Sequence, residues 1–186
     1  WGHDAMDHAI RKLDRRQGYR GPLGNLRDPS KRAEFKRRLI AKYGPTPLES
    51  DPERWRIALV EEVSKKHAKV ELGAYQAQLN LRHMAWASHY DRNTGVNDTK
   101  IKRVDHALEV GDVIWVRPVM VKVKPASEGK KKPKPTQKRA QPEVEQRVLA
   151  TDKKSGERMV ELGQDTRNEA AVYTLEHGSG YVTGMQ

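Results

Sequence analysis

The feature that most constrains the fold is an alternation of apolar and polar residues between residues 54 and 72. Its apolar members are Trp55, Ile57, Leu59, Val63, Ala68, Val70 and Leu72. Successive side chains of a β-strand point to opposite faces, so the pattern predicts strands at 54–63 and 68–72 that each bury one face. A tight turn at residues 64–66 joins them. The chain is therefore expected to fold around a sheet.

A third run of alternating residues follows a turn at Gly73 and changes phase along its length. Its apolar positions are first Ala77, Leu79 and Leu81, and then Met84 and Trp86. One extra residue in a strand moves the later side chains to the other face, so the shift predicts a β-bulge near His83. Small, strongly curved barrels commonly contain such bulges.

Further strands are expected downstream. A polar, turn-rich stretch at 87–99 and a short helix of about two turns at 101–108 precede a β-branched strand at 113–123. Pro118 has no backbone N–H to donate, so it indicates a sheet edge or a bulge within that strand. Two hairpin signals follow, which pair 147–151 with 158–162 and 171–175 with 181–183.

Two helices are expected before the first strand. An apolar stripe at Met6, Ile10 and Leu13 marks the first of them. It ends near Gly18, and the second helix has Asp28 as its N-cap, Pro29 at its first position and Gly44 at its end. The order of elements predicts a mainly β fold with helical additions. Its most specific form is an OB-like five-stranded barrel with an N-terminal helical arm.

Three parts of the chain differ in composition and pattern. Residues 1–50 form a helical arm and linker, residues 51–163 form the OB-like barrel, and residues 164–186 form strands that return toward a further domain. Near 125–141, a segment rich in Lys and Pro is too polar to pack and is expected to be a disordered basic loop.

Composition limits the classes of protein that remain. The chain has no cysteine, which excludes disulfides and thiolate chemistry. It has no long apolar run and no signal-peptide pattern, so a soluble protein is expected. Its net charge of +11 suggests a polyanionic partner, but the positive charge is concentrated in 1–50 and 122–139. Residues 51–121 are nearly neutral, so no continuous basic groove is expected across the barrel.

Three segments share their order and spacing with a known family. They are residues 14–22 (DRRQGYRGP), Trp86-Ala87 followed by 108–117 (LEVGDVIWVR), and 169–185. Together they resemble the bifunctional class A penicillin-binding proteins of the 1a type. In that family they follow the glycosyltransferase domain, lie in an OB-like domain, and return to the transpeptidase domain. The stretch at 142–156 is a second candidate for the return, and 169–185 is preferred.

This resemblance implies a periplasmic domain of an inner-membrane-anchored enzyme that polymerises glycan from lipid II and cross-links stem peptides. The domain itself would be a non-catalytic regulatory and docking module. Its partners would be the parent glycosyltransferase and transpeptidase domains and an outer-membrane lipoprotein activator.

Candidate contact residues lie in two places. A proline-containing strand edge and a polar loop suit a protein partner, which indicates Tyr90, Arg92, Arg117 and Pro118. A lysine run suits peptidoglycan or another anionic envelope polymer, which indicates Lys130, Lys131, Lys132 and Lys134.

No catalytic, cofactor or metal site is predicted. Penicillin-reactive enzymes need a Ser with a Lys three residues later on a helix, and a Lys-Thr/Ser-Gly strand. Residues 127–130 and 154–156 spell these motifs, but the first lies in the polar loop, so we interpret both as chance. The spacing of the histidines does not suit paired metal ligands.

Three tryptophans leave an alternative function open. Trp55, Trp86 and Trp115 each lie on a predicted strand, where they either pack in or over the barrel core or face outward. Outward rings between basic residues would stack on bases, so the alternative is a single-stranded nucleic-acid-binding OB module. Each tryptophan sits in or beside an apolar alternation, which favours the packing role. The near-neutral charge of residues 51–121 argues against the nucleic-acid alternative.

Overall fold

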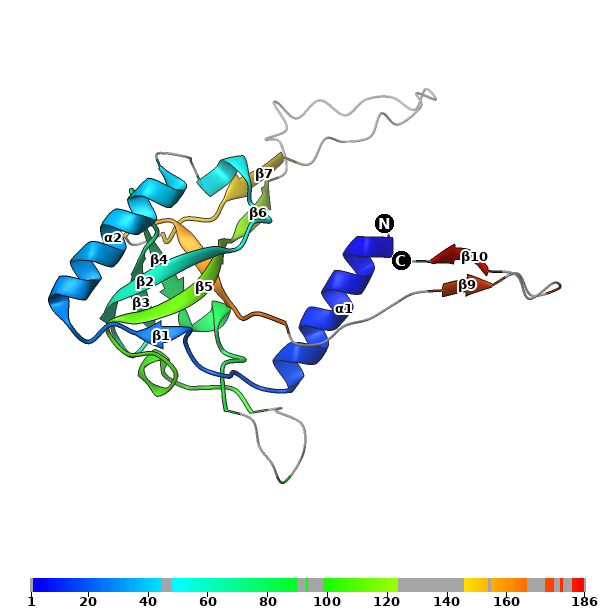
Figure 1. The fold of residues 1–186 in the computed structure, drawn as a ribbon, viewed down its shortest axis with the longest axis horizontal. Coiled ribbons are helices and arrows are strands. Elements are labelled where there is room, and N and C mark those ends of the chain that lie inside the picture. The colour runs from blue at the N-terminus through cyan, green and yellow to red at the C-terminus, as the bar shows by residue number, and fades with distance from the viewer. Residues whose placement is uncertain are drawn as a thin grey trace, which may run out of the picture.

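The computed structural model describes residues 2–44, 48–89, 93, 99–123, 146–153, 155–166, 173–175, 178 and 182–185. Figure 1 shows the arrangement of their helices and strands. In chain order these are α1 (Gly2–Arg16), β1 (Gly24–Asn25), α2 (Pro29–Tyr43), β2 (Arg56–Val63), β3 (His67–Glu71), β4 (Gln76–Asn80), β5 (Asp112–Pro118), β6 (Met120–Val123), β7 (Gln146–Leu149), β8 (Met159–Gly163), β9 (Tyr173–Leu175) and β10 (Val182–Met185).

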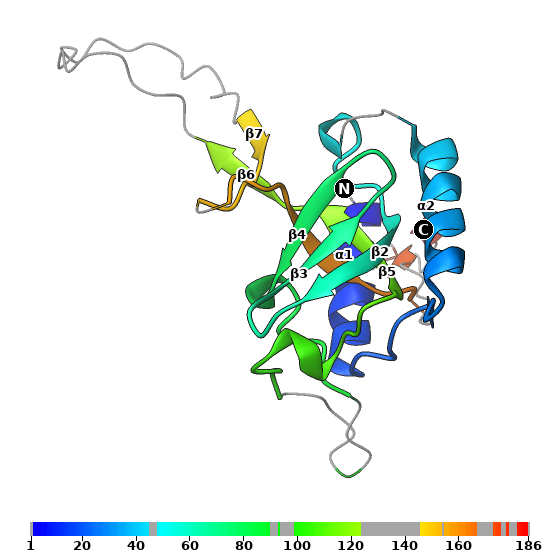
Figure 2. The ribbon, with the colours of Figure 1, turned by 90° about the vertical axis from the view of Figure 1, so that its left-hand side faces the viewer.

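Five strands close into a barrel. β2, β3 and β4 form an antiparallel meander, and β5 pairs antiparallel with β2. β8 closes the ring because it pairs in parallel with β4 and antiparallel with β5. α2 covers one side of this barrel, and α1 lies against another (Figures 1 and 2). The predicted mainly β fold, an OB-like five-stranded barrel with helical additions, is confirmed.

The barrel interior and the space beneath α2 are two separate apolar clusters. Buried side chains of the interior include Ala58, Val60, Val70, Leu79, Ile114, Val116, Val160 and Leu162. β2 is buried on both faces, since Leu59 packs under α2 with Leu39 and Tyr43. Ile57 and Leu59 share one face as predicted, but the expectation that the strand buries a single face is wrong: this face packs under the helix, and Ala58 and Val60 face the barrel. A strand that is covered on both sides has no polar face.

Two segments after β4 differ from their predictions. In the described stretch 48–89 no bulge occurs near His83, because β4 ends at Asn80 and a single 3-10 turn, Leu81–His83, follows. The predicted two-turn helix at 101–108 is one 3-10 turn, Val104–His106. The backbone N–H groups of Ile101 and Val104 donate to the carbonyls of Ala85 and Lys65, so tertiary hydrogen bonds hold this segment in place of a helix.

The predicted strand at 113–123 is divided into β5 and β6. Pro118 ends β5: it is buried and stands opposite Val160 of β8, and the pairing of β5 with β2 stops at Val116. The predicted strand thus breaks at this proline. The chain leaves the barrel at Val119, whose N–H donates to the Met159 carbonyl and whose carbonyl accepts from the Ala150 N–H. β6 then pairs with β7 as a two-stranded ribbon that projects from the barrel (Figure 2).

The two predicted hairpins have different outcomes. β7 pairs with β6, and β8 enters the barrel, so the hairpin predicted for 147–151 and 158–162 is reduced to one bridge between Thr151 and Arg158. The second hairpin is confirmed, since β9 and β10 pair antiparallel. No helix in the described part of the chain is both long and apolar enough to cross a membrane.

The two helices attach to the barrel in different ways. α2 matches its prediction: the Asp28 side chain accepts from the Ser30 N–H at 2.8 Å, and Gly44 with φ of 56° ends the helix. α1 turns a polar side to the barrel, with Asp14 only 2% exposed and Leu13 48% exposed. The predicted apolar stripe of α1 therefore does not make its main contact with the barrel.

Candidate functional site

The arm joins the barrel where the chain enters and leaves it. Asp14, near the end of α1, is the buried centre of this junction. One of its carboxylate oxygens accepts from Nη1 of Arg20 at 2.7 Å, and the other accepts from Nε2 of Gln164 at 2.7 Å. Arg20 belongs to the incoming segment and Gln164 follows the last barrel strand. One buried carboxylate therefore binds both the segment that enters the barrel and the segment that leaves it.

Further hydrogen bonds join the same two segments. The Gln164 amide also donates to the Gly18 carbonyl at 3.2 Å, and its oxygen accepts from the Arg20 backbone N–H at 3.2 Å. The Arg20 guanidinium also donates to the Asp165 carbonyl. We call these five residues, Asp14, Gly18, Arg20, Gln164 and Asp165, the clasp. It fixes the path of the incoming segment relative to the outgoing one.

Aromatic and cationic side chains support the clasp. The guanidinium groups of Arg11 and Arg117 lie 5.1 and 4.8 Å from the centre of the Trp55 ring. Gly163 packs so closely on this ring that a Cβ atom there would lie 2.1 Å from Cζ3 of Trp55. Trp55 thus links α1, β5 and β8.

Trp86 makes a second contact of the same kind. Arg15 lies 5.3 Å from the Trp86 ring centre, and Tyr19 meets this ring edge-on at 5.8 Å. Trp86 also packs against the barrel core. These rings serve as packing surfaces between the arm and the barrel, which agrees with the packing role and leaves little ring face for stacking on bases.

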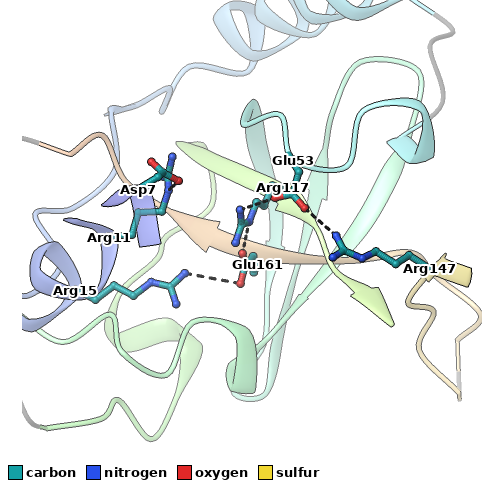
Figure 3. A network of polar contacts seen from close by, with 7 residues as sticks. All are labelled: Asp7, Arg11, Arg15, Glu53, Arg117, Arg147 and Glu161. Carbon is teal, nitrogen blue, oxygen red and sulfur yellow. Dashed lines mark hydrogen bonds and ion pairs between the residues drawn. The ribbon is translucent and has the colours of Figure 1, made fainter. Parts of the chain in front are cut away.

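Figure 3 shows a network of charged side chains at the same junction. Glu161 on β8 pairs with Arg117 on β5 and, at 3.7 Å, with Arg15 on α1. Glu53 pairs with Arg117 at 3.2 Å and with Arg147 of β7 at 3.5 Å. The network therefore connects the arm, the barrel and the base of the projecting ribbon.

The network contains more arginines than carboxylates. Burial lowers the pKa of the Arg15 guanidinium; Glu161 opposes the shift, and Arg117 and Arg11 add to it. An arginine remains protonated under these conditions. The junction thus holds the guanidinium groups of Arg11, Arg15 and Arg117 close together, each in an ion pair with a carboxylate.

The predicted contact residues fall in different surroundings. Arg117 lies in the charge network, and Pro118 is buried in the barrel wall. Tyr90, Arg92 and the lysines at 130, 131, 132 and 134 lie outside the described residues, as does the serine of the motif at 127–130. Among the residues that the structure describes, no three His, Asp or Glu side chains are grouped to hold a metal ion.

The clasp could not be inferred from pattern. Residues 14–22 stand out in the sequence through the family resemblance, but nothing in them indicates that Asp14 is buried. Gln164 lies 150 residues away along the chain. A lone glutamine after a strand gives no periodic or motif signal.

The comparisons with known proteins agree with this geometry. Residues 19–144 match the family model described as the penicillin-binding protein OB-like domain. Two relatives named penicillin-binding protein 1A, from Rickettsia prowazekii and Rickettsia typhi, are 29% and 31% identical over 117 residues. Each match covers 62% of this chain and 13% of the relative, so the chain spans only a small part of its relatives' length. With a closed five-stranded barrel and a family match over most of its length, the chain belongs to the penicillin-binding protein OB-like domain family.

Proposed function

We propose that this domain is a non-catalytic docking and regulatory module of a bifunctional peptidoglycan synthase. The parent protein would combine a glycosyltransferase with a transpeptidase, and the domain would lie between them in the periplasm. Its partners would be these two catalytic domains and an outer-membrane lipoprotein activator. Contacts with peptidoglycan or anionic polymers through Lys130, Lys131, Lys132 and Lys134 belong to the same proposal.

The observation that carries this proposal is the clasp. A domain inserted into a longer chain influences its neighbours through the two segments that connect it to them. Here Asp14 and Gln164 tie these segments together, so a partner that moves the barrel would also move both connections. The shared hydrogen bonds make a fixed spacing between the flanking domains the expected resting state.

We propose from the sequence that this domain catalyses no reaction of its own. A preorganised Ser-Lys pair needs both side chains on one helical face, and the only such spelling lies in the polar segment at 127–130. The described junction consists of Arg, Trp and carboxylate side chains that are paired with one another. Side chains that are paired in this way hold structural elements together.

The clasp can be tested in the full-length protein. Gln164→Ala removes the amide that spans Asp14 and Gly18, and Gln76→Ala, at an exposed position of β4, is the matched control. Glycan polymerisation and peptide cross-linking are measured separately from the same lipid-linked substrate. We expect Gln164→Ala to change the ratio of cross-linking to polymerisation, because the two catalytic domains lose their fixed spacing, and Gln76→Ala to leave it unchanged.

A second variant gives the decisive result. If deletion of residues 23–163, with a short flexible linker in their place, leaves both rates and their response to envelope extracts unchanged, the domain has no regulatory role. Strong, salt-sensitive binding of a labelled single-stranded oligonucleotide would instead support the nucleic-acid-binding alternative.

A further inference from the structure

A large open groove lies on the side of the barrel formed by β3 and β4. It has a volume of about 1450 Å³, and its walls include these strands, the 3-10 turn after β4, residues 100–102 and the β6–β7 ribbon. β3 and β4 are the second and third strands of the barrel, and the ribbon belongs to the connection between its fourth and fifth strands. In OB folds, this face and these loops bind oligonucleotides and oligosaccharides.

The ribbon gives the groove an exposed apolar wall. Val121 of β6 and Val148 of β7 stand directly opposite each other, and they are 47% and 49% exposed. Leu81, Ile101 and Met159 continue the apolar surface toward the barrel. Two exposed aliphatic side chains in register on a projecting ribbon form a surface that a partner would cover.

Lysines edge this apolar surface. Lys66, Lys100, Lys102 and Lys153 line the groove, and none of them makes an ion pair with a described residue. Lys69 pairs with Glu62 at 2.9 Å, and Arg82 donates to the sulfur of Met159 at 3.0 Å.

The carboxylates on the same lining are few. They are Asp152, which accepts from Asn80 and from the Ser155 N–H, and Glu157. The fold therefore gathers lysines from the nearly neutral segment 51–121, together with Lys153, on one face.

The side chains that line the groove indicate which kind of molecule it binds. Its one ring among the described residues is the His67 imidazole, so the groove offers no stacking surface for bases or sugars. Its volume also exceeds that of an ordinary small-molecule pocket. An apolar stripe between lysines that pair with no described carboxylate matches a polypeptide whose apolar side chains are flanked by carboxylates.

We propose that this groove is the docking site for an acidic, amphipathic segment of a partner protein. The inference deepens the proposed function and rests on it, since it names the surface and the partner chemistry of the docking module. The apolar side chains of the segment contact Val121 and Val148, and its carboxylates pair with Lys66, Lys100, Lys102 and Lys153.

The test places a photo-crosslinking residue at Val148 of the full-length protein in its own cells, and at Val121 in a second variant. Both side chains are half exposed, so neither substitution removes a core contact. The same residue at Val110, which is exposed on the loop before β5, is the control. After irradiation, the cross-linked peptide is identified by mass spectrometry. We expect a peptide of another protein with Asp or Glu flanking apolar positions, from Val148 and Val121 but not from Val110.

Charge reversal supplies the second measurement. Lys100→Glu together with Lys102→Glu is expected to lower the cross-link yield about tenfold, as expected when facing charges become alike. The matched double reversal Lys31→Glu and Arg37→Glu, at exposed positions of α2, is expected to leave the yield unchanged.

Several outcomes would overturn the proposal. They are a cross-link to residues 124–145 of the same chain, to a second copy of the chain or to nucleic acid, a neutral or basic partner peptide, equal effects of the two charge reversals, or no cross-link at all. If the domain deletion still alters synthesis while no acidic peptide is captured, the groove assignment fails and the proposed function stands. If an acidic peptide is captured while synthesis is indifferent to the deletion, docking stands and regulation fails.

Discussion

Replacement of Gly163 by alanine tests the packing of the junction. Gly163 does not have a positive φ, so the backbone accepts alanine there, and the effect must come from contact. The new Cβ would lie 2.1 to 2.6 Å from three carbons of the Trp55 ring. Because neither β8 nor a ring held between arginines moves freely, we expect Gly163→Ala to displace the indole.

The magnitude follows from two contributions. Overpacking of a filled site costs about 1–3 kcal/mol. Displacement of the ring also weakens its contacts with Arg11 and Arg117, each of which contributes about 0.5–1 kcal/mol at a partly exposed position. The free energy of unfolding should therefore fall by about 2–4 kcal/mol.

Urea unfolding, followed by circular dichroism, measures this loss. Gly24→Ala in β1 is the matched control, because a Cβ there meets nothing within 4 Å, and we expect almost no change. In a Trp55→Leu background, Gly163→Ala should cost about 1–2 kcal/mol less than in the native chain, since the clashing ring is gone. A loss below about 0.5 kcal/mol for Gly163→Ala, or strict additivity with Trp55→Leu, would refute the account of this contact.

Three further predictions concern other contacts. Tyr43→Phe removes the hydroxyl that accepts from the Ile57 N–H at 2.8 Å, which should lower the free energy of unfolding by about 1–3 kcal/mol in thermal or urea unfolding. Asp14→Ala removes the carboxylate that accepts hydrogen bonds from the Gln164 amide and the Arg20 guanidinium. Hydrogen exchange should then show faster opening of α1, while the barrel strands stay protected. The side-chain and backbone hydrogen bonds from Ser30 hold the pKa of Asp28 below its usual range. Because a lowered carboxyl pKa stabilises the fold above the ordinary Asp range, the first turn of α2 should lose exchange protection as the pH falls through the folded pKa, and Asp28→Asn should remove this pH dependence.

Local signals predicted the elements that depend on few residues. The ends of α2 follow from Asp28, Pro29 and Gly44, since capping needs only neighbouring residues. The β3–β4 pair follows from clean alternation with one polar face. The five-stranded barrel follows from the order of such elements.

Elements that depend on distant partners were not predictable in the same way. The burial of both faces of β2 was not predicted, because it depends on α2 packing over the strand. The helix expected at 101–108 is replaced by hydrogen bonds with Lys65 and Ala85. The clasp joins Asp14 to Gln164, and neither has a signal of its own. The lysines of the groove come from separate turns and connections. The net charge of a sequence segment therefore does not reveal that the fold brings them together on one surface.

The parallel pairing of β4 with β8 has a consequence for how the chain folds. β2, β3 and β4 are neighbours along the chain and can form early, but the ring closes only when β8, about eighty residues later, reaches β4 and β5. Until then the free edges of β4 and β5 are exposed to other chains. During synthesis, the residues up to 163 must have left the ribosome before the barrel can close. The long connection between β4 and β8 therefore adds a loop-closure cost to the last step of barrel formation.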